Sequence, residues 1–249
     1  MNRPRRHPAA LACLIAVSFL AGCAGAPELP PEIAAQPKLA EAAQAPSVID
    51  VYDPFEGLNR AIYNFNAGFD RYVFLPIVRA YEFVTPVFIQ NRLSDFFDNI
   101  QEIPTFANNV LQLKADAAGR SATRLIVNTM FSAGLFDLAG AKGVPQVPED
   151  FGQTLGHWGA GAGPYLVIPV LGPSNLRDAT GLAADAALLW ALTPAVVADS
   201  WPLTGTRYGL QGIDTRHRTA FRYFETGSPF EYDLVRLIYT EKRRLDIAN

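Results

Sequence analysis

The chain has few of the residues on which most catalytic and metal sites depend. Its 249 residues include only two cysteines, Cys13 and Cys23, and three histidines. No Gly-x-Ser-x-Gly, His-Glu-x-x-His or paired-cysteine motif is present, so the usual signatures of serine hydrolases and zinc proteins are missing. No glycine-rich segment is followed by the Lys-Ser/Thr of a phosphate loop. We therefore expect a protein that is not an enzyme and that holds no metal or cofactor.

Positive charge is also scarce. Lysine and arginine number 21 against 24 acidic residues, which gives a formal net charge of −3. Arg3, Arg5 and Arg6 lie in the first few residues, and without them the balance is 18 against 24, or −6. A protein that binds nucleic acid normally presents a basic surface. The balance therefore argues against nucleic acid as a partner.

A hydrophobic run long enough to span a membrane is absent from the N-terminus. The apolar residues 11–20 follow a basic start and are too few for a span, so residues 1–22 are predicted to be a signal peptide. Leu20-Ala21-Gly22-Cys23 has the form of a bacterial lipobox, which predicts that Cys23 is acylated. The alternative is a small-residue cleavage site with a chance cysteine. Ala24 is not the aspartate typical of inner-membrane retention, which favours the outer membrane.

The composition changes sharply near residue 51. Residues 23–51 are rich in proline and alanine and contain no aromatic side chain, so they are predicted to form an extended tether. From Tyr52 onward aromatic residues are frequent, with 16 phenylalanines and nine tyrosines in the whole chain. This surplus predicts apolar surface that faces something other than water. We expect one folded domain over residues 52–249.

Helical periodicity dominates this domain. Apolar residues recur at steps of three and four from Phe55 to Val73, which predicts an amphipathic helix that Pro76 ends. Further helices are predicted over 77–84, from 86 to 113 with an interruption at Pro104, over 121–138 and 181–198, and twice more before the C-terminus. Two acidic capping boxes, at 53–56 and 228–231, mark helix starts. The pattern predicts a mostly helical domain.

Residues 151–176 contain no Asp, Glu, Lys or Arg. Their glycines and prolines exclude a membrane-spanning helix. The segment is either a Gly/Pro-rich loop packed in a soluble core or the wall of a cavity in a protein that meets lipid. Irregular backbone occurs at membrane depth only where it is buried in protein or lines a cavity, because its N–H and C=O groups need partners. Only residues 165–171 have the character of a strand, and Pro169 argues against one.

A second open reading concerns Asn64-Phe65-Asn66, where two amides flank an aromatic residue within a predicted helix. Buried amides must be paired or must line something wet. An amphipathic passage and an ordinary contact within the fold satisfy that condition equally well.

Four blocks of the sequence together resemble the MlaA/VacJ family of outer-membrane lipoproteins. They are residues 53–66, 99–112, 124–139 and 150–181, and they organise most of the chain from 52 to about 210. The last block is the most specific, with Thr-Leu-Gly-x-Trp-Gly, Gly-Pro-Tyr and Gly-Pro-Ser-x-x-Arg-Asp in order. Ser132 stands where the family commonly has glycine, which is a departure from its pattern.

The resemblance implies an all-α, ring- or disc-like domain of amphipathic helices with a Gly/Pro-rich irregular segment. It implies a lipid-anchored protein on the periplasmic side of the outer membrane of a Gram-negative bacterium. Its cargo would be phospholipid mislocalised to the outer leaflet, and its partners a trimeric porin and a soluble, MlaC-like periplasmic carrier. Two rival functions are a structural envelope lipoprotein that scaffolds porins and a lipid hydrolase, which the missing nucleophile motif disfavours.

The same resemblance implies a central amphipathic channel, and the sequence offers candidates for its lining. Polar lining is expected from Asn64, Asn66 and Tyr165, with Phe65 as an apolar neighbour. The glycines expected to permit close backbone turns are Gly159, Gly161 and Gly163.

Overall fold

The computed structural model describes residues 51–193 and 200–248. By its contacts the chain divides into two units, residues 1–46 and 47–249, and the described residues belong to the second. The predicted signal peptide, Cys23 and nearly all of the tether therefore lie outside the described residues. Residues 194–198, at the end of one predicted helix, also lie outside them.

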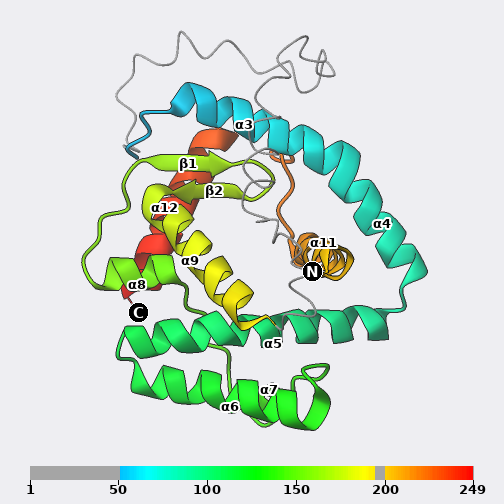
Figure 1. Cartoon of the computed structure of the whole chain (residues 1–249). Helices are drawn as coiled ribbons and strands as arrows, with labels where there is room; N and C mark the ends of the chain where they lie inside the picture. The colour runs from blue at the N-terminus through cyan, green and yellow to red at the C-terminus, as the bar shows by residue number, and fades with distance from the viewer. Residues whose placement is uncertain (1–50, 194–199, 249) are drawn as a thin grey trace, which may run out of the picture. The chain divides into compact units, whose positions relative to one another are not determined.

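The domain begins with one continuous helical run, made of α3 (Glu56–Phe69), the π-helix η3 (Asp70–Phe74) and α4 (Leu75–Val84) (Figure 1). The prediction that Pro76 ends this helix is wrong. In η3 the Leu75 N–H donates to the Asp70 carbonyl, five residues back, so the ladder shifts by one residue before the proline. Pro76, which has no N–H to donate, follows this wider turn directly, in the first turn of α4.

The acidic residues of the two predicted capping boxes have other roles. No side chain caps α3, and Asp53 instead accepts hydrogen bonds from Asn59 (2.7 Å) and from the Tyr232 hydroxyl. Glu231 accepts from the Tyr63 hydroxyl at 2.7 Å. Both carboxylates thus join α3 to α12 (Glu231–Ala248), which lies far away in the sequence. The predicted cap residues lie within three residues of the helix starts. The Ser228 hydroxyl accepts the Phe230 N–H at 3.2 Å as an N-cap should, but neither acidic residue closes its capping box.

Helix α5 (Val87–Leu111) passes through Pro104 without a break, so the predicted interruption there is wrong. Hydrogen bonds to α6 hold α5 on both sides of the proline, from Asn99 to Thr129 at 2.9 Å and from Asn109 to Ser121 at 3.4 Å. This tertiary support offsets one lost ladder bond. Helix α6 (Ala115–Ser132) ends at left-handed Ala133 (φ 52°), and the short α7 (Leu138–Ala141) follows.

The uncharged segment is more regular than predicted. It contains α8 (Phe151–His157) and a hairpin of β1 (Tyr165–Ile168) and β2 (Gly172–Asn175), paired with Tyr165 opposite Asn175 and Ile168 opposite Gly172. Pro169 lies just beyond β1, in the connection, so it removes no ladder bond. The strand signal in this segment was therefore correct for its first four residues.

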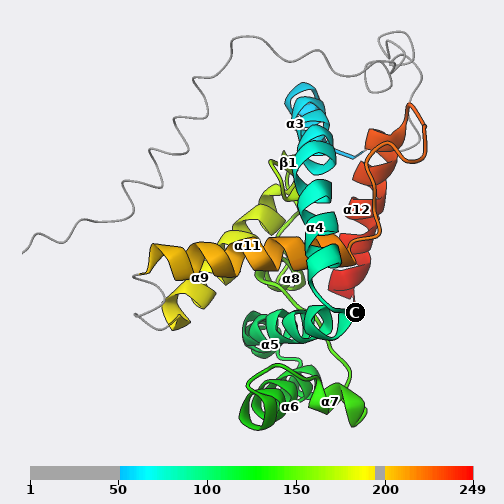
Figure 2. The ribbon, with the colours of Figure 1, turned by 90° about the vertical axis from the view of Figure 1, so that its right-hand side faces the viewer.

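The remaining helices are α9 (Leu176–Leu192), α11 (Trp201–Arg218) and α12. Figure 1 shows α11 end-on between α4 and α5, and Figure 2 shows it lying across α4. A mostly helical domain with one small hairpin confirms the all-α prediction. No helix in the described ranges has the length and hydropathy needed to cross a membrane.

Candidate functional site

The distribution of side chains is inverted relative to a typical soluble domain. Among the described residues, 23 polar or charged residues are buried, but only 10 hydrophobic residues are. By contrast, 36 large hydrophobic side chains are exposed. Scattered exposed apolar residues are ordinary, whereas extensive apolar surface marks a binding partner or a membrane. The exterior of this domain therefore suits an apolar environment.

The exposed apolar side chains follow the outer faces of nearly all the helices. On α4 and α6 the most exposed are Phe83 (90%), Phe131 (75%) and Met130 (74%). Trp158 follows α8 and is exposed except for its indole N–H, which donates to the Leu111 carbonyl at 3.0 Å. Trp201 begins α11 and is 81% exposed. We call this set the apolar exterior.

The buried polar groups are held in ion-pair networks that tie distant helices together. Arg243 on α12 donates to Asp178 on α9 (2.8 Å) and to Asp150 (2.7 Å) before α8. Burial alone would raise the pKa of Asp178, but hydrogen bonds from Arg243 and Tyr239 outweigh burial and hold that pKa below its ordinary value. These buried charges have partners, so loss of one partner would leave the other as an uncompensated buried charge.

The predicted lining residues lie in different surroundings. Asn66 is 2% exposed, its Nδ2 donates to the Ile168 carbonyl (3.0 Å), and its Oδ1 accepts from the Val170 N–H (2.7 Å). Asn59 lies seven residues earlier on the same face of α3. Its Nδ2 donates to the Tyr165 carbonyl, and its Oδ1 accepts from the Val167 N–H. Asn66 therefore supports the hairpin, and of the two readings of the amide pair its geometry matches the contact within the fold.

Asn64 and Phe65 lie elsewhere on α3. Asn64 is half-buried, and Phe65 is 55% exposed and stacks on Phe69 at 6.1 Å between ring centroids. Phe65 thus belongs to the apolar exterior. Tyr165 is buried and its ring packs edge-on against Tyr232 at 6.2 Å. Tyr165 therefore lies in the aromatic core that joins the hairpin to α12.

The three glycines are exposed in the loop between α8 and β1. Gly159 (φ +90°) and Gly163 (φ +70°) adopt the left-handed backbone that favours glycine, and a Cβ on Gly163 would lie 3.1 Å from that of Leu176. Gly161 has no neighbour that would exclude a side chain. The turn-forming role thus has geometric support at two of the three positions.

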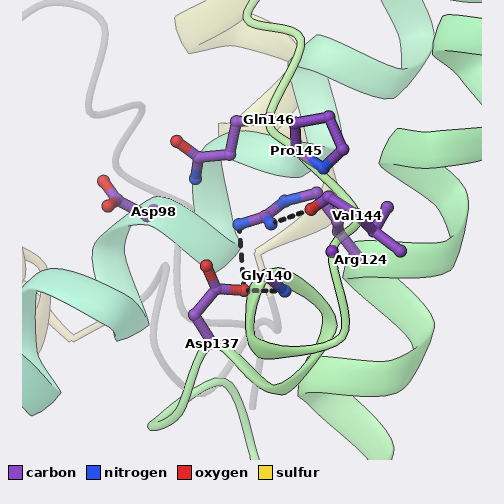
Figure 3. A pocket seen from close by; sticks show the side chains of 8 residues that line it. Asp98, Arg124, Asp137, Gly140, Val144, Pro145 and Gln146 are labelled. Atoms are coloured by element: carbon purple, nitrogen blue, oxygen red, sulfur yellow. Dashed lines mark hydrogen bonds and ion pairs between the residues drawn. The ribbon is translucent and has the colours of Figure 1, made fainter.

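A polar groove lies between α5, α6, α7 and residues 143–148, and Figure 3 shows its larger part. This part has a volume of about 450 Å³ and is lined by Asp98, Arg124, Asp137, Gly140, Gly143, Val144, Pro145 and Gln146. A second part of about 140 Å³ shares Asp98 and Gln146 and adds Gln101, Glu102, Thr105, Val147 and Pro148. We call the two parts the α5–α7 groove. None of the predicted lining residues borders it.

Arg124 is a buried residue that lines the larger part of this groove. Its Nη1 donates to the Val144 carbonyl (2.8 Å) and its Nη2 pairs with Asp137 (3.1 Å), as Figure 3 shows. Its Nε pairs with Glu102 Oε1 (2.5 Å). The other Glu102 oxygen, Oε2, is buried without a hydrogen-bond partner among the described residues. Burial raises the pKa of Glu102, the Arg124 pairing opposes that rise, and Asp137 and Asp98 add to it.

Sequence reasoning missed Asn59, Glu102 and Arg124 as individual residues. Glu102 lies within the block 99–112 and Arg124 begins the block 124–139. The resemblance of these blocks to the family was the signal that could have pointed to both residues. In the described part of the chain, no group of three His, Cys, Asp or Glu side chains is arranged to hold a metal ion.

Comparison with known proteins identifies the family. The model of the MlaA lipoprotein family matches residues 51–246. The chain belongs to the MlaA lipoprotein family. It is 38% identical over 170 residues to a Shigella flexneri protein and 36% identical to one from Escherichia coli K12, both named intermembrane phospholipid transport system lipoprotein MlaA. Each of these alignments covers 66% of this chain and 65% of the relative.

Other relatives match over a shorter stretch. An uncharacterized protein of Rickettsia felis is 38% identical over 133 residues, so the chain spans about half the length (53%) of this relative. A solved chain from work on the structural basis for maintenance of bacterial outer membrane lipid asymmetry superimposes with a TM-score of 0.63 at 28% identity. That likeness covers 78% of this chain and 98% of the solved one.

Proposed function

We propose that this protein is an outer-membrane lipoprotein that removes mislocalised phospholipids from the outer leaflet and passes them to a soluble periplasmic carrier. The observation that carries the proposal is the apolar exterior on a domain whose described helices cannot span a membrane. Such a domain is suited to lie within one leaflet. The relatives named for intermembrane phospholipid transport support the same activity.

The proposed mechanism is a passive conduit. A phospholipid must carry a charged headgroup past an apolar region, where a polar group without partners is costly. Paired polar side chains next to the apolar exterior lower that barrier without bond chemistry. Acylation of Cys23 would hold the domain at the periplasmic face, and a trimeric porin and an MlaC-like carrier would be its partners on either side.

The primary test is the amount of phospholipid in the outer leaflet of a strain that lacks the chain. An acyltransferase that acts only on surface-exposed phospholipid provides the readout. We expect accumulation that the wild type reverses and that Cys23→Ala does not, because the unacylated chain loses its anchor. If the deletion strain accumulates no surface phospholipid, the transport function is wrong.

The lining prediction is tested by Asn64→Leu, with Asn66→Leu as a matched variant. Asn64→Leu should fail to reverse the accumulation while leaving thermal unfolding unchanged. Asn66→Leu should lower stability by about 1–3 kcal/mol, because it leaves the hairpin N–H and C=O groups unpaired. Full complementation by Asn64→Leu would remove this residue from the proposed lining.

Two rivals have separate readouts. A lipid hydrolase would release lysophospholipid when purified protein is incubated with phospholipid vesicles, and we expect none. A pure scaffold would co-purify with a porin trimer and yet leave outer-leaflet lipid unchanged on deletion. Either result would replace the transport proposal.

A further inference from the structure

We propose that the α5–α7 groove binds a primary ammonium group, of the kind that an ethanolamine headgroup carries. The inference rests on the proposed function and adds a headgroup preference to it. Phosphatidylethanolamine would then bind better than a lipid whose headgroup is quaternary or uncharged.

The first observation is the charge balance around the groove. Three carboxylates line it, those of Asp98 and Glu102 on α5 and of Asp137 before α7, and the carboxylate of Asp95 on α5 lies near Asp98 and Asp137. Three guanidinium groups face them, as Arg92 pairs with Asp95 (2.9 Å), Arg218 with Asp98 (2.9 Å), and Arg124 with both Glu102 and Asp137. Arg218 is also shared with Asp214 at 2.9 Å. The groove therefore has more negative than positive charge.

The second observation is the unpartnered oxygen of Glu102. This side chain is 3% exposed, lines the smaller part of the groove, and uses only Oε1 to bind Arg124. Its Oε2 is an acceptor that the described residues leave without a donor. A buried carboxylate oxygen in this condition favours a ligand that supplies an N–H.

The chemical class of the ligand follows from the hydrogen-bond donors and acceptors of the residues that line the groove. Among the described residues, Arg124 is the only guanidinium that lines either part of the groove, and each of its three nitrogens already pairs with a protein oxygen. The excess of carboxylates around it therefore disfavours a phosphate and favours a cation. A primary ammonium group has three donors, one positive charge and no acceptor. A trimethylated ammonium has no N–H and cannot satisfy Oε2.

The volumes agree with a headgroup rather than a whole lipid. The smaller part, about 140 Å³, is the size of a short amine, and the larger part of about 450 Å³ beside it leaves room for the group that follows. The ammonium could belong to a membrane lipid or to a free amine such as phosphoethanolamine. The chemistry is shared, and the experiment separates the two sources.

The test uses the purified full-length protein in two arms. One arm measures pelleting with vesicles of equal negative charge that contain either phosphatidylethanolamine or phosphatidylcholine. The other measures binding of soluble phosphoethanolamine by calorimetry. We expect the wild type to prefer the ethanolamine vesicles by at least about tenfold, the value of one hydrogen bond to a charged group.

Glu102→Gln should abolish this preference, because it removes the charge and presents an amide donor. Asp98→Asn is the second variant, since its side chain is partly exposed and tolerates change. Glu56→Gln, an exposed acidic position outside the groove, is the matched control and should keep the preference. Thermal unfolding of each variant establishes that it is folded.

The outcomes are distinct. Binding of soluble phosphoethanolamine that Glu102→Gln removes supports an ammonium site open to free amines, and a preference confined to vesicles supports a lipid headgroup site. A wild type with no preference in either arm overturns the proposal, as does a preference that survives in both groove variants. Failure of the transport function would appear separately, as unchanged outer-leaflet lipid in the deletion strain.

Discussion

The region around α3, the hairpin and α12 differs in its interior from the region around α5, α6 and α7. The first encloses a cluster of Tyr63, Tyr165, Val167 and Tyr232, with the ring of Tyr63 edge-on to Tyr232 at 5.6 Å. In the second, the buried positions carry mainly amides and charges, while its large apolar side chains point outward. Both regions carry exposed apolar side chains, but only the first also encloses a cluster of large rings.

This difference indicates two modes of stabilisation within one domain. The aromatic cluster removes apolar area from water and so stabilises the first region in any aqueous buffer. The second region relies on internal hydrogen bonds and ion pairs, and its exterior gains free energy only from an apolar surrounding. The first region should therefore be the stable platform, and the second should depend on lipid or detergent.

The largest expected effect comes from breaking the ion pair in the second region. Arg124→Met leaves Glu102 buried without its cation and should destabilise the protein by about 3–5 kcal/mol, measured by urea unfolding in detergent. The double variant Glu102→Gln/Arg124→Met should recover much of this loss. A cost below about 1 kcal/mol for the single variant would contradict the claim that charge pairing holds this region together.

A smaller effect is expected from the aromatic region. Tyr63→Phe keeps the ring contacts and removes only the hydroxyl that donates to Glu231, so the free energy of unfolding should fall by about 1–3 kcal/mol. Tyr208→Phe, on an exposed ring, should leave it unchanged. Equal effects of the two substitutions would show that the Tyr63–Glu231 bond adds nothing to this region.

The elements with local signals were largely predictable from the sequence. Apolar periodicity located most of the helices, and the strand character of residues 165–168 was visible. The errors at Pro76 and Pro104 have a common cause, because proline rules describe an isolated helix. In the fold, a π-turn before Pro76 and packing around Pro104 decide the outcome.

The candidate site was less predictable because its contacts are not local. Asn66 finds its partners about a hundred residues later, at Ile168 and Val170, and nothing near Asn66 signals that pairing. The Glu102–Arg124 pair likewise joins two helices. Polar residues at helical spacing indicate that their side chains need hydrogen-bond partners. Only the tertiary arrangement shows whether those partners are protein groups or a bound ligand.

The third prediction concerns pH and the network that joins α12 to α8 and α9. The pKa of Asp178 is lowered from its ordinary value of 3.8, so its pairing with Arg243 adds stability above that value and loses it as the pH falls further. The melting temperature should therefore decline below about pH 4. Asp178→Asn should flatten this decline, and an unaltered pH profile would exclude Asp178 as its source.

The smallest effect on stability is expected at the apolar exterior. Phe83→Ser should change the free energy of unfolding in detergent by no more than about 0.5 kcal/mol, because the ring is 90% exposed. The same variant should bind phospholipid vesicles more weakly in a flotation assay. Unchanged flotation would mean that α4 does not contact the membrane, and would leave α6 as the better candidate.

The π-turn at Asp70–Phe74 has a consequence for how the gene can vary. A π-helix is an α-helix that has accepted one additional residue, so losing one codon in this stretch would remove the wide turn and leave Pro76 inside a regular α-helix. It would also rotate everything beyond it by about 100°, one residue's share of a helical turn. The outward face of α4 would turn away, and Asp70 would leave Arg216, its partner on α11. A one-residue deletion would thus misalign the domain, so this part of the gene tolerates substitutions far better than deletions.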